Sequence, residues 1–300
     1  MDKKQFNEIP ISTRTIIVST NVDINIPNLF KHLPITEYKV VEKKRGRKKK
    51  DFIETINNNV ADGSIISVKY QGDLRGVELK KKKKSNKYFR NAVTIIISVN
   101  NKLINLKIST NGKFQVTGCK NFDNCKCAIK HLLNILTLNK EVYFNKCGDK
   151  IQITFNNVMT NKDFSMGITV NRENLDKIIN IETNYKSLYE ISFGYTGVNL
   201  KMQLDKNLER EFNCMEFDIN TQTYRDYTIN YEDYIKTLNE KELIKENKDK
   251  YITFLVFQSG NVIMSGMNEI FMEKYYNIFY DIVQNNLHSI EDKLVKFYFK

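Results

Sequence analysis

Four side chains that could bind a metal ion lie close together in the sequence: Cys119, Cys125, Cys127 and His131. Thiolate and imidazole groups are ligands of Zn²⁺. Cys127 and His131 would share one face of a helix, because residues at this spacing lie one turn apart. A structural zinc site usually takes its ligands from two paired sets, however, and the sequence offers no second pair. Cys125 also fits an apolar helical pattern, so we expect no metal site and no cofactor.

Catalytic side chains form no recognisable arrangement in this sequence. The histidines His32, His131 and His288 are scattered and have no nucleophile arranged beside them. The acidic pair Glu232-Asp233 lies in a charged stretch that is typical of a solvated loop. No glycine-rich phosphate-binding loop occurs, and no motif marks the Asp or Lys that a glycosylase would need in a base pocket. We therefore expect that the protein is not an enzyme.

One short passage occurs twice. Residues 111–118 and 259–266 each place two glycines at the same spacing, with a hydroxyl residue before the second glycine. Each copy follows a strand rich in β-branched residues and precedes an amphipathic helix. A repeated strand–turn–strand–helix unit predicts a duplicated α+β protein with pseudo-twofold symmetry.

Charge and composition narrow the class of partner. The chain has 300 residues, 41% of them hydrophobic, and a net charge of +12. This charge favours a polyanionic partner such as nucleic acid, although an AT-rich genome would also inflate the count of lysine codons. The five cysteines do not form a disulfide framework, which fits a reducing compartment. We expect no membrane segment and no secretion signal, because no apolar stretch is long enough for either.

Local patterns predict the elements that carry the repeat. Alternating β-branched residues predict strands, and apolar residues spaced by threes and fours predict helices. The expected strands are 15–20, 65–68, 90–99, 102–108, 151–159, 188–193, 198–203 and 251–257, and the expected helices are 26–33, 171–180, 240–248 and those after Gly118 and Gly266.

Two lobes account for the whole pattern. We expect a first lobe over residues 12–140, with an insertion over about 42–87 that contains basic runs at 42–50 and 80–84. The second lobe covers residues 141–300 and carries an insertion over about 204–250. Basic runs of this kind are usually solvated loops, and the first of them also fits a nuclear-localisation or nucleic-acid-binding patch.

The order of these motifs resembles the TATA-box-binding protein family, especially its divergent versions in large DNA viruses. The second half carries the clearest matches: Tyr195-Thr196-Gly197 before a strand, Phe257-Gln258-Ser259-Gly260, and Ile263-Met264-Ser265-Gly266. The first half matches through Ile17-Val18-Ser19-Thr20, Phe89 and Val116-Thr117-Gly118. The resemblance implies a saddle-shaped antiparallel sheet with helices on its convex face, whose concave face binds the DNA minor groove.

The resemblance also implies roles for individual residues. In the second lobe Asn156 would donate to base acceptors, and Tyr195 and Phe257 would be wedges that open base steps. An apolar floor and a hydroxyl contact complete the set: Val158, Leu255 and Ile263 for the floor and Ser265 for the hydroxyl. In the first lobe the corresponding residues are Phe89 as a wedge, Thr117 as the hydroxyl and Val18 in the floor. Without the resemblance, the two phenylalanines would be assigned to the core and Thr117 and Ser265 to turns.

The first lobe departs from the family pattern at four positions. Ile16 replaces the first asparagine, Ser109 replaces the second wedge, and polar residues replace floor positions at Lys107 and Gln115. We therefore expect an asymmetric saddle in which the second lobe does most of the kinking.

The function implied by the resemblance is binding and bending of A·T-rich double-stranded DNA in transcription initiation, by a monomer. Its implied partners are a transcription factor IIB-like protein and RNA polymerase machinery, in a nucleus or a cytoplasmic viral factory. Two alternatives stay open: a protein-interaction scaffold that kept this fold but lost DNA binding, and a two-repeat sliding-clamp-like protein that forms rings.

Overall fold

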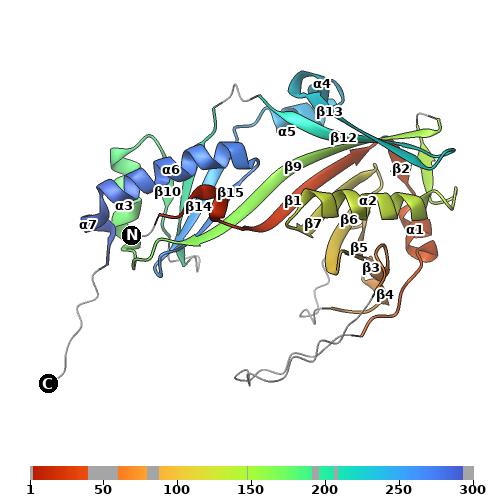
Figure 1. Ribbon diagram of the computed structural model, residues 1–300, viewed down its shortest axis with the longest axis horizontal. Helices are drawn as coiled ribbons and strands as arrows, with labels where there is room; N and C mark the ends of the chain where they lie inside the picture. The colour runs from red at the N-terminus through yellow and green to blue at the C-terminus, as the bar shows by residue number, and fades with distance from the viewer. Residues whose placement is uncertain are drawn as a thin grey trace. The chain divides into compact units, whose positions relative to one another are not determined.

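The computed structural model describes residues 3–39, 60–79, 88–146, 148–190, 196–205 and 209–292 (Figure 1). The chain divides into two compact units. Unit 1 comprises Met1–Arg14, Asn157–Glu211 and Ile229–Lys300, and unit 2 comprises Thr15–Asn156 and Phe212–Thr228. Both combine antiparallel strands with helices, which confirms the predicted α+β class. In the part of the chain that the structure describes, no helix is long and apolar enough to cross a membrane.

Unit 2 contains most of the first half of the chain. Its strands are hydrogen-bonded in the order β1-β7-β6-β5-β3-β4. Helix α2 packs on β5 and β7 (Figure 1). The bounds are β1 Ile11–Thr20, β3 Ile65–Tyr70, β4 Asp73–Gly76, β5 Ala92–Val99, β6 Lys102–Ser109, β7 Lys113–Cys119, α1 Ile26–His32 and α2 Phe122–Leu136, with a small separate pair formed by β2 Val22–Ile24 and β8 Tyr143–Asn145.

Unit 1 contains most of the second half. Its strand order is β10-β11-β14-β15-β9, with α6 on β15 and α3 on β10 and β11. The bounds are η1 Phe6–Glu8, β9 Lys150–Ser165, α3 Arg172–Glu182, β10 Lys186–Leu188, β11 Gly197–Gln203, α4 Tyr231–Lys236, α5 Glu240–Glu246, β14 Tyr251–Phe257, β15 Asn261–Gly266, α6 Glu269–Asn285 and α7 Leu287–Ile290. The ranges of β1 and β9 extend across the boundary between the units, so both strands contribute residues to each.

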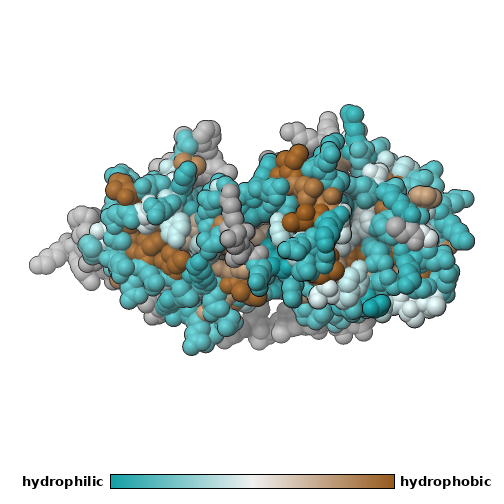
Figure 2. All heavy atoms as spheres, turned by 90° about the horizontal axis from the view of Figure 1, so that it is seen from above, coloured by the Kyte–Doolittle hydropathy of each residue, from teal (hydrophilic) through white to brown (hydrophobic). Residues whose placement is uncertain are grey.

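Each unit has its own apolar core between one sheet face and its helices. In unit 2 alternate residues of β5, β6 and β7 meet the buried stripe of α2, including Ile129 and Leu133. In unit 1 alternate residues of β11, β14 and β15 meet α6, where the rings of Phe254 and Phe279 stack with centroids 4.4 Å apart. The surface in Figure 2 is mostly hydrophilic, with separate apolar patches.

Asparagine begins both of the long helices. Asn121 accepts a hydrogen bond from the backbone N–H of Asp123, and Asn268 accepts one from that of Ile270. An amide oxygen at this position satisfies a backbone donor that the first helical turn leaves without a partner. Helices α1 and α3 begin in the same way, at Asn25 and Asn171.

A hairpin from the second predicted insertion belongs to unit 2. Strands β12 (Glu211–Asp218) and β13 (Thr223–Asn230) form the hairpin, and β12 pairs with the first part of β9. Tyr224 stacks on Phe217 with ring centroids 4.4 Å apart, and its hydroxyl donates to Asn134 Oδ1 of α2 at 2.6 Å. Burial raises the pKa of Tyr224 well above its usual range. The insertion is therefore anchored on the helix of the other half of the sequence.

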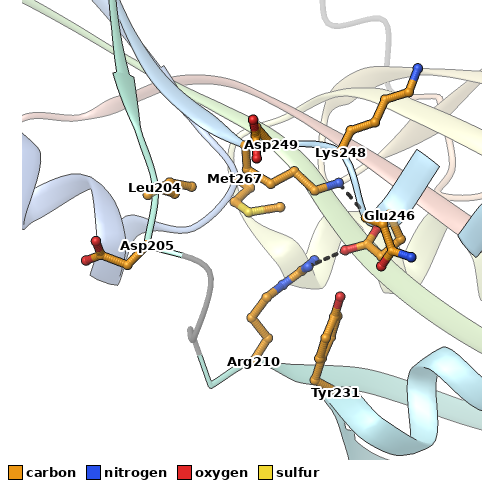
Figure 3. A pocket seen from close by; sticks show the side chains of 10 residues that line it. Leu204, Asp205, Arg210, Tyr231, Glu246, Lys248, Asp249 and Met267 are labelled. Carbon is orange, nitrogen blue, oxygen red and sulfur yellow. Dashed lines mark hydrogen bonds and ion pairs between the residues drawn. The ribbon is translucent and has the colours of Figure 1, made fainter. Parts of the chain in front are cut away.

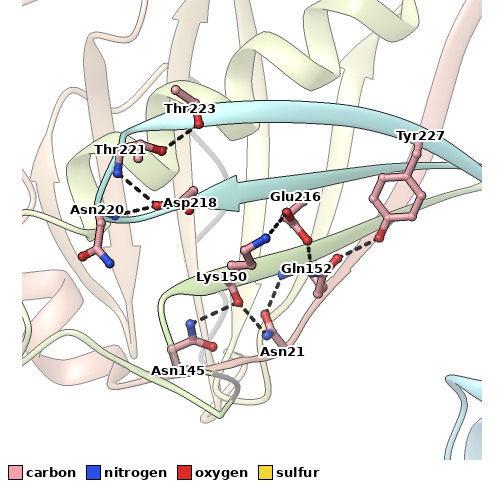
Figure 4. A network of polar contacts seen from close by, with 10 residues as sticks. All are labelled: Asn21, Asn145, Lys150, Gln152, Glu216, Asp218, Asn220, Thr221, Thr223 and Tyr227. Atoms are coloured by element: carbon pink, nitrogen blue, oxygen red, sulfur yellow. Dashed lines mark hydrogen bonds and ion pairs between the residues drawn. The ribbon is translucent and has the colours of Figure 1, made fainter.

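Polar contacts fix the other face of this hairpin (Figure 4). Gln152 of β9 lies between two hairpin side chains, accepting from the Tyr227 hydroxyl at 2.8 Å and donating to Glu216 at 2.7 Å. Lys150 also donates to Glu216, and this hydrogen bond lowers the pKa of the carboxyl group. The pKa of Lys150 is raised by the same contact.

Most of the predicted elements are confirmed. Expected strands and helices appear with shifted ends, including the strand at 65–68 as β3 and the helix at 240–248 as α5. Strand β3 pairs with β5, so part of the predicted first insertion is integral to the sheet. The basic runs at 42–50 and 80–84 and the end of the strand expected at 188–193 lie outside the described residues.

Candidate nucleic-acid interface

The first glycines of the two repeated passages occupy the same kind of turn. Gly112 has φ 69° and Gly260 has φ 77°, in the left-handed region that favours glycine. A Cβ atom at Gly112 would lie 2.0 Å from the carbonyl oxygen of Val22, and one at Gly260 would lie 2.0 Å from that of Ile168. Both turns therefore require glycine for two reasons, backbone conformation and close approach of a second segment.

Backbone hydrogen bonds around these turns also correspond. Thr20 N–H donates to Gly112 O at 3.1 Å in unit 2, and Met166 N–H donates to Gly260 O at 2.8 Å in unit 1. A second bond follows in each case, from Ile24 to Thr110 and from Val170 to Gln258, both 2.8 Å long. This common hydrogen-bond frame pairs positions in the two halves one by one. It pairs Lys107 with Leu255, Gln115 with Ile263, Thr117 with Ser265, and Ile17 with Asp163.

A row of side chains crosses the half-exposed sheet face of unit 1. Cross-strand register aligns Leu188, Asn199, Leu255, Ile263 and Asp163 on five neighbouring strands. Residues directly opposite one another on antiparallel strands project from the same face. Their sequence neighbours on β11, β14 and β15 are buried in the core, so this row lies on the face away from α6. We call it the unit 1 row.

The corresponding row of unit 2 has a different chemistry. Register aligns Lys69, Thr94, Lys107 and Gln115 on β3, β5, β6 and β7. Val93, Leu106 and Phe114 beside them are buried, so these four side chains also lie on the half-exposed face. We call this set the unit 2 row. The central position that holds Leu255 in unit 1 thus holds Lys107 in unit 2.

Five of the predicted DNA-contacting residues lie on these half-exposed faces. Leu255 and Ile263 belong to the unit 1 row, and Phe257 projects from the same side of β14. Ser265 and Thr117 are half-exposed at corresponding positions of β15 and β7. The structure therefore brings together, within unit 1, two residues predicted for the apolar floor, one predicted wedge and one predicted hydroxyl contact.

The other predicted contacts are placed differently. Phe89 is 66% exposed and Val158 is 41% exposed, whereas Val18 is fully buried among the core residues of unit 2. The side chains that flank Val18 on β1, Ile17 and Ser19, are half-exposed. Tyr195 lies outside the described residues.

The two expected asparagine positions are not equivalent in the structure. The hydrogen-bond frame pairs Thr20 with Met166 and therefore pairs Ile16 with Lys162, whereas Asn156 precedes Lys162 by six residues. Asn156 is buried, with 9% of its surface exposed. Lys162 is also buried, and its ammonium donates to Ile9 O at 2.7 Å and lies 3.3 Å from Glu269.

Sequence reasoning missed the side chains of β9 that share the unit 1 face. Asp163 is exposed within the unit 1 row, and Asn161 lies opposite Ser265. Ser12 of β1 donates to Asp163 Oδ1 at 3.0 Å and to Asn161 O at 3.2 Å. The strand was expected to end at residue 159, so these positions were outside the pattern. Alternation of Asn161, Asp163 and Ser165 with Thr160, Lys162 and Phe164 is the signal that could have found them.

Two cysteines of the candidate metal cluster lie in core positions. Cys119 and Cys125 are buried in unit 2, on β7 and α2. A hydrogen bond with the Cys119 thiol, together with burial, raises the pKa of the Cys125 thiol well above its ordinary value. The described residues contain no group of three or more His, Cys, Asp or Glu side chains that could hold a metal ion.

A pocket in unit 1 is lined by charges of both signs (Figure 3). Arg210 forms an ion pair with Glu246, and Lys250 lies 3.4 Å from the same carboxylate. Neutralised cations of this kind offer little attraction to an anionic ligand. The sheet faces are therefore better candidates for a functional surface than this pocket.

Comparison with known proteins gives a family-model match and viral relatives. Residues 55–138 match the family model described as transcription factor TFIID or TATA-binding protein, TBP. The chain is 29% identical to an uncharacterized protein, 335L, of Invertebrate iridescent virus 6, covering 67% of this chain and 62% of that protein. It is 28% identical to a TATA-box-binding protein-like protein of Acanthamoeba polyphaga mimivirus, covering 68% of this chain and 58% of the relative. The chain thus spans about three fifths of the length of these relatives.

Among solved structures, Methanococcus jannaschii TBP aligns with a TM-score of 0.47 at 12% identity, covering 93% of this chain and 98% of that one. The matched region of the family model begins inside the predicted first insertion and includes β3 through α2. The chain is therefore similar, over residues 55–138, to the TATA-box-binding protein family and, over about two thirds of its length, to two viral proteins, one of them described as TATA-box-binding protein-like.

Proposed function

We propose that this protein binds A·T-rich double-stranded DNA through the minor groove, bends it, and acts in transcription initiation. The observation that carries the proposal is the grouping of Leu255, Ile263, Phe257 and Ser265 on one half-exposed sheet face. Apolar side chains and small hydroxyls suit the minor groove, whose floor presents mainly acceptors at A·T pairs. An aromatic ring at its edge can stack on an opened base step.

Two further observations support the proposal. The net charge of +12 provides attraction to the phosphate backbone. The common hydrogen-bond frame supports an internal repeat, in which each half supplies one face to the DNA. We extend the proposal to the partners implied by the resemblance, a transcription factor IIB-like protein and RNA polymerase machinery, and to action as a monomer in a nucleus or viral factory.

Fluorescence anisotropy with labelled duplexes tests this proposal. We expect tighter binding to an A·T-rich duplex than to a G·C-rich duplex of equal length at the same salt concentration. A duplex labelled with a donor and an acceptor at its ends should show increased energy transfer on binding, because bending shortens the end-to-end distance. Equal affinity for both duplexes would reduce the interaction to general electrostatics, and no binding at low salt would refute it.

One observation favours a second candidate, a protein-interaction scaffold. Asp163 places a carboxylate in the unit 1 row, and its negative charge opposes a close approach of DNA phosphates. An exposed face that combines Leu188, Leu255 and Ile263 with an acidic rim would suit a basic, apolar protein segment. Failure to bind DNA, together with a measured affinity for a protein component of the transcription machinery, would favour this candidate.

A further inference from the structure

Lys107 occupies an unusual position for a lysine on a sheet. It lies on β6 in the middle of the unit 2 strand order, and register places it between Thr94 and Gln115. Its ammonium lies 3.7 Å from the centroid of the Phe89 ring, which is a cation–π contact. The Phe89 ring is itself 66% exposed. The ring is therefore capped on one side by a positive charge and remains accessible.

Lys69 adds a second cation to the same row. It lies on β3 opposite Thr94, and it is exposed. One strand, β5, lies between them, so the backbones of Lys69 and Lys107 are two strand spacings, or about 10 Å, apart. The side chains between and beside them, Thr94 and Gln115, are uncharged. The unit 2 row thus carries two positive charges and no carboxylate.

On the half-exposed face of unit 1, lysines lie near the edge of the sheet and not at its centre. Lys186 and Lys201 lie on the edge strand β10 and its neighbour β11, in the row next to the unit 1 row. The position equivalent to Lys107 is Leu255, and the row that contains it ends at Asp163. A central lysine beside an exposed aromatic ring is therefore a feature of unit 2 alone among the described faces.

We propose that the unit 2 row is a phosphate-contacting surface for nucleic acid, in which Lys107 leaves the Phe89 ring to reach a phosphate when the ring is covered by a base. This inference rests on the proposed function and names the chemistry of the unit 2 face. Exposed cation–π contacts are weak, so a phosphate can compete for the ammonium. Release of the ammonium exposes the ring face on which a base can stack, as aromatic side chains do in nucleic-acid-binding proteins. Unit 2 would then bind mainly by charge and unit 1 mainly by apolar contact.

The salt dependence of duplex binding tests the phosphate contacts. Each phosphate that is neutralised contributes about 0.9 to the slope of log affinity against log salt concentration. We expect the double variant Lys69→Met, Lys107→Met to lower this slope by about 1.8 for both A·T-rich and G·C-rich duplexes, since phosphates are common to both. Lys177→Met is the matched control, because Lys177 lies on helix α3 and pairs with Glu173. A slope that changes no more in the double variant than in this control would overturn the proposal.

Nuclear magnetic resonance tests the exchange of the ammonium between ring and phosphate. In the free protein the ring current of Phe89 should shift the Lys107 ε-methylene protons upfield, and Phe89→Leu should abolish the shift. Addition of an A·T-rich duplex should abolish it in the wild-type protein, and an unchanged shift in the bound state would overturn the release step. The two proposals can fail separately. Absence of a preference for the A·T-rich duplex would contradict the proposed function, but the salt slope and the ring-current shift would still test the phosphate contacts of unit 2.

A protein that binds no duplex at low salt would overturn both proposals.

Discussion

The two half-exposed rows share one backbone frame but differ in side-chain chemistry. From β10 to β9 the unit 1 row reads Leu188, Asn199, Leu255, Ile263 and Asp163. The unit 2 row reads Lys69, Thr94, Lys107 and Gln115 from β3 to β7. The frame is set by glycine turns and backbone hydrogen bonds, which do not depend on what projects from the open face. The open faces can therefore differ in chemistry while the backbone frame stays the same.

The largest expected effect concerns the frame itself. Replacement of Gly112 or Gly260 with alanine should lower the free energy of unfolding by at least about 2 kcal/mol in each case, since the new Cβ meets a carbonyl oxygen in a strained backbone conformation. Gly72→Ala is the control, because Gly72 also has a positive φ but has no atom within 4 Å of the added Cβ. Denaturant titration measures all three. If Gly112→Ala lowers the free energy of unfolding by no more than Gly72→Ala does, the turn is less constrained than its geometry indicates.

A second prediction compares the wedges. Phe257→Ala should weaken binding to an A·T-rich duplex by about 1–3 kcal/mol, the range for loss of base–aromatic stacking. Phe144→Ala removes a ring on β8 that is more exposed than that of Phe257 and lies outside both rows, and it should leave the affinity unchanged. Anisotropy titration at one salt concentration gives both values. Equal losses would show that the Phe257 face has no special role.

A third prediction concerns Lys162, which is buried at the position where the first half of the chain has the buried Ile16. Lys162→Met should lower the free energy of unfolding by about 1–3 kcal/mol, because the carbonyl of Ile9 and the carboxylate of Glu269 lose a donor. The exposed pair of Lys177 and Glu173 provides a control in Lys177→Met, whose effect should stay within about 0.5 kcal/mol. A more stable Lys162→Met protein, measured by thermal and denaturant unfolding, would show that the buried cation serves something other than stability.

The smallest expected effect tests the charge difference between the rows. Asp163→Asn should tighten duplex binding by about 1 kcal/mol at low salt, because a carboxylate repels nearby phosphates with an energy of this order. The gain should shrink as salt rises, since exposed charges are screened. Asp205→Asn is a control, because Asp205 forms its ion pair with Lys274 on the side of α6. No gain in the Asp163 variant would indicate that DNA does not approach the unit 1 row.

Sequence patterns located most elements because their signals are local. Asparagine caps, proline in the first turn of α1 and β-branched runs all act within a few residues. The sequence also indicated the glycine turns, since φ above zero is accessible to few other residues. It did not indicate that β9 continues to Ser165, because polar residues alternate with Lys162 and Thr160 there instead of with apolar ones.

Placement of the site residues was less predictable. Val18 lies in an apolar strand whose two faces look alike in sequence, and only packing assigns its side chain to the core. A shift of one residue would exchange the faces, as it does for any strand. The hairpin at residues 211–230 was expected as part of a second-lobe insertion, but Tyr224 anchors its second strand to α2 of unit 2.

The amino-acid sequence by itself determined the α+β class, the two glycine turns, the helix caps and the resemblance to the TATA-box-binding protein family. These properties follow from residue type and local spacing. Tertiary structure alone decided that Lys107 caps Phe89, that Asp163 joins Leu255 and Ile263 in one row, and that Lys162 is buried. Such contacts join residues far apart in the chain, and strand register and core packing set them.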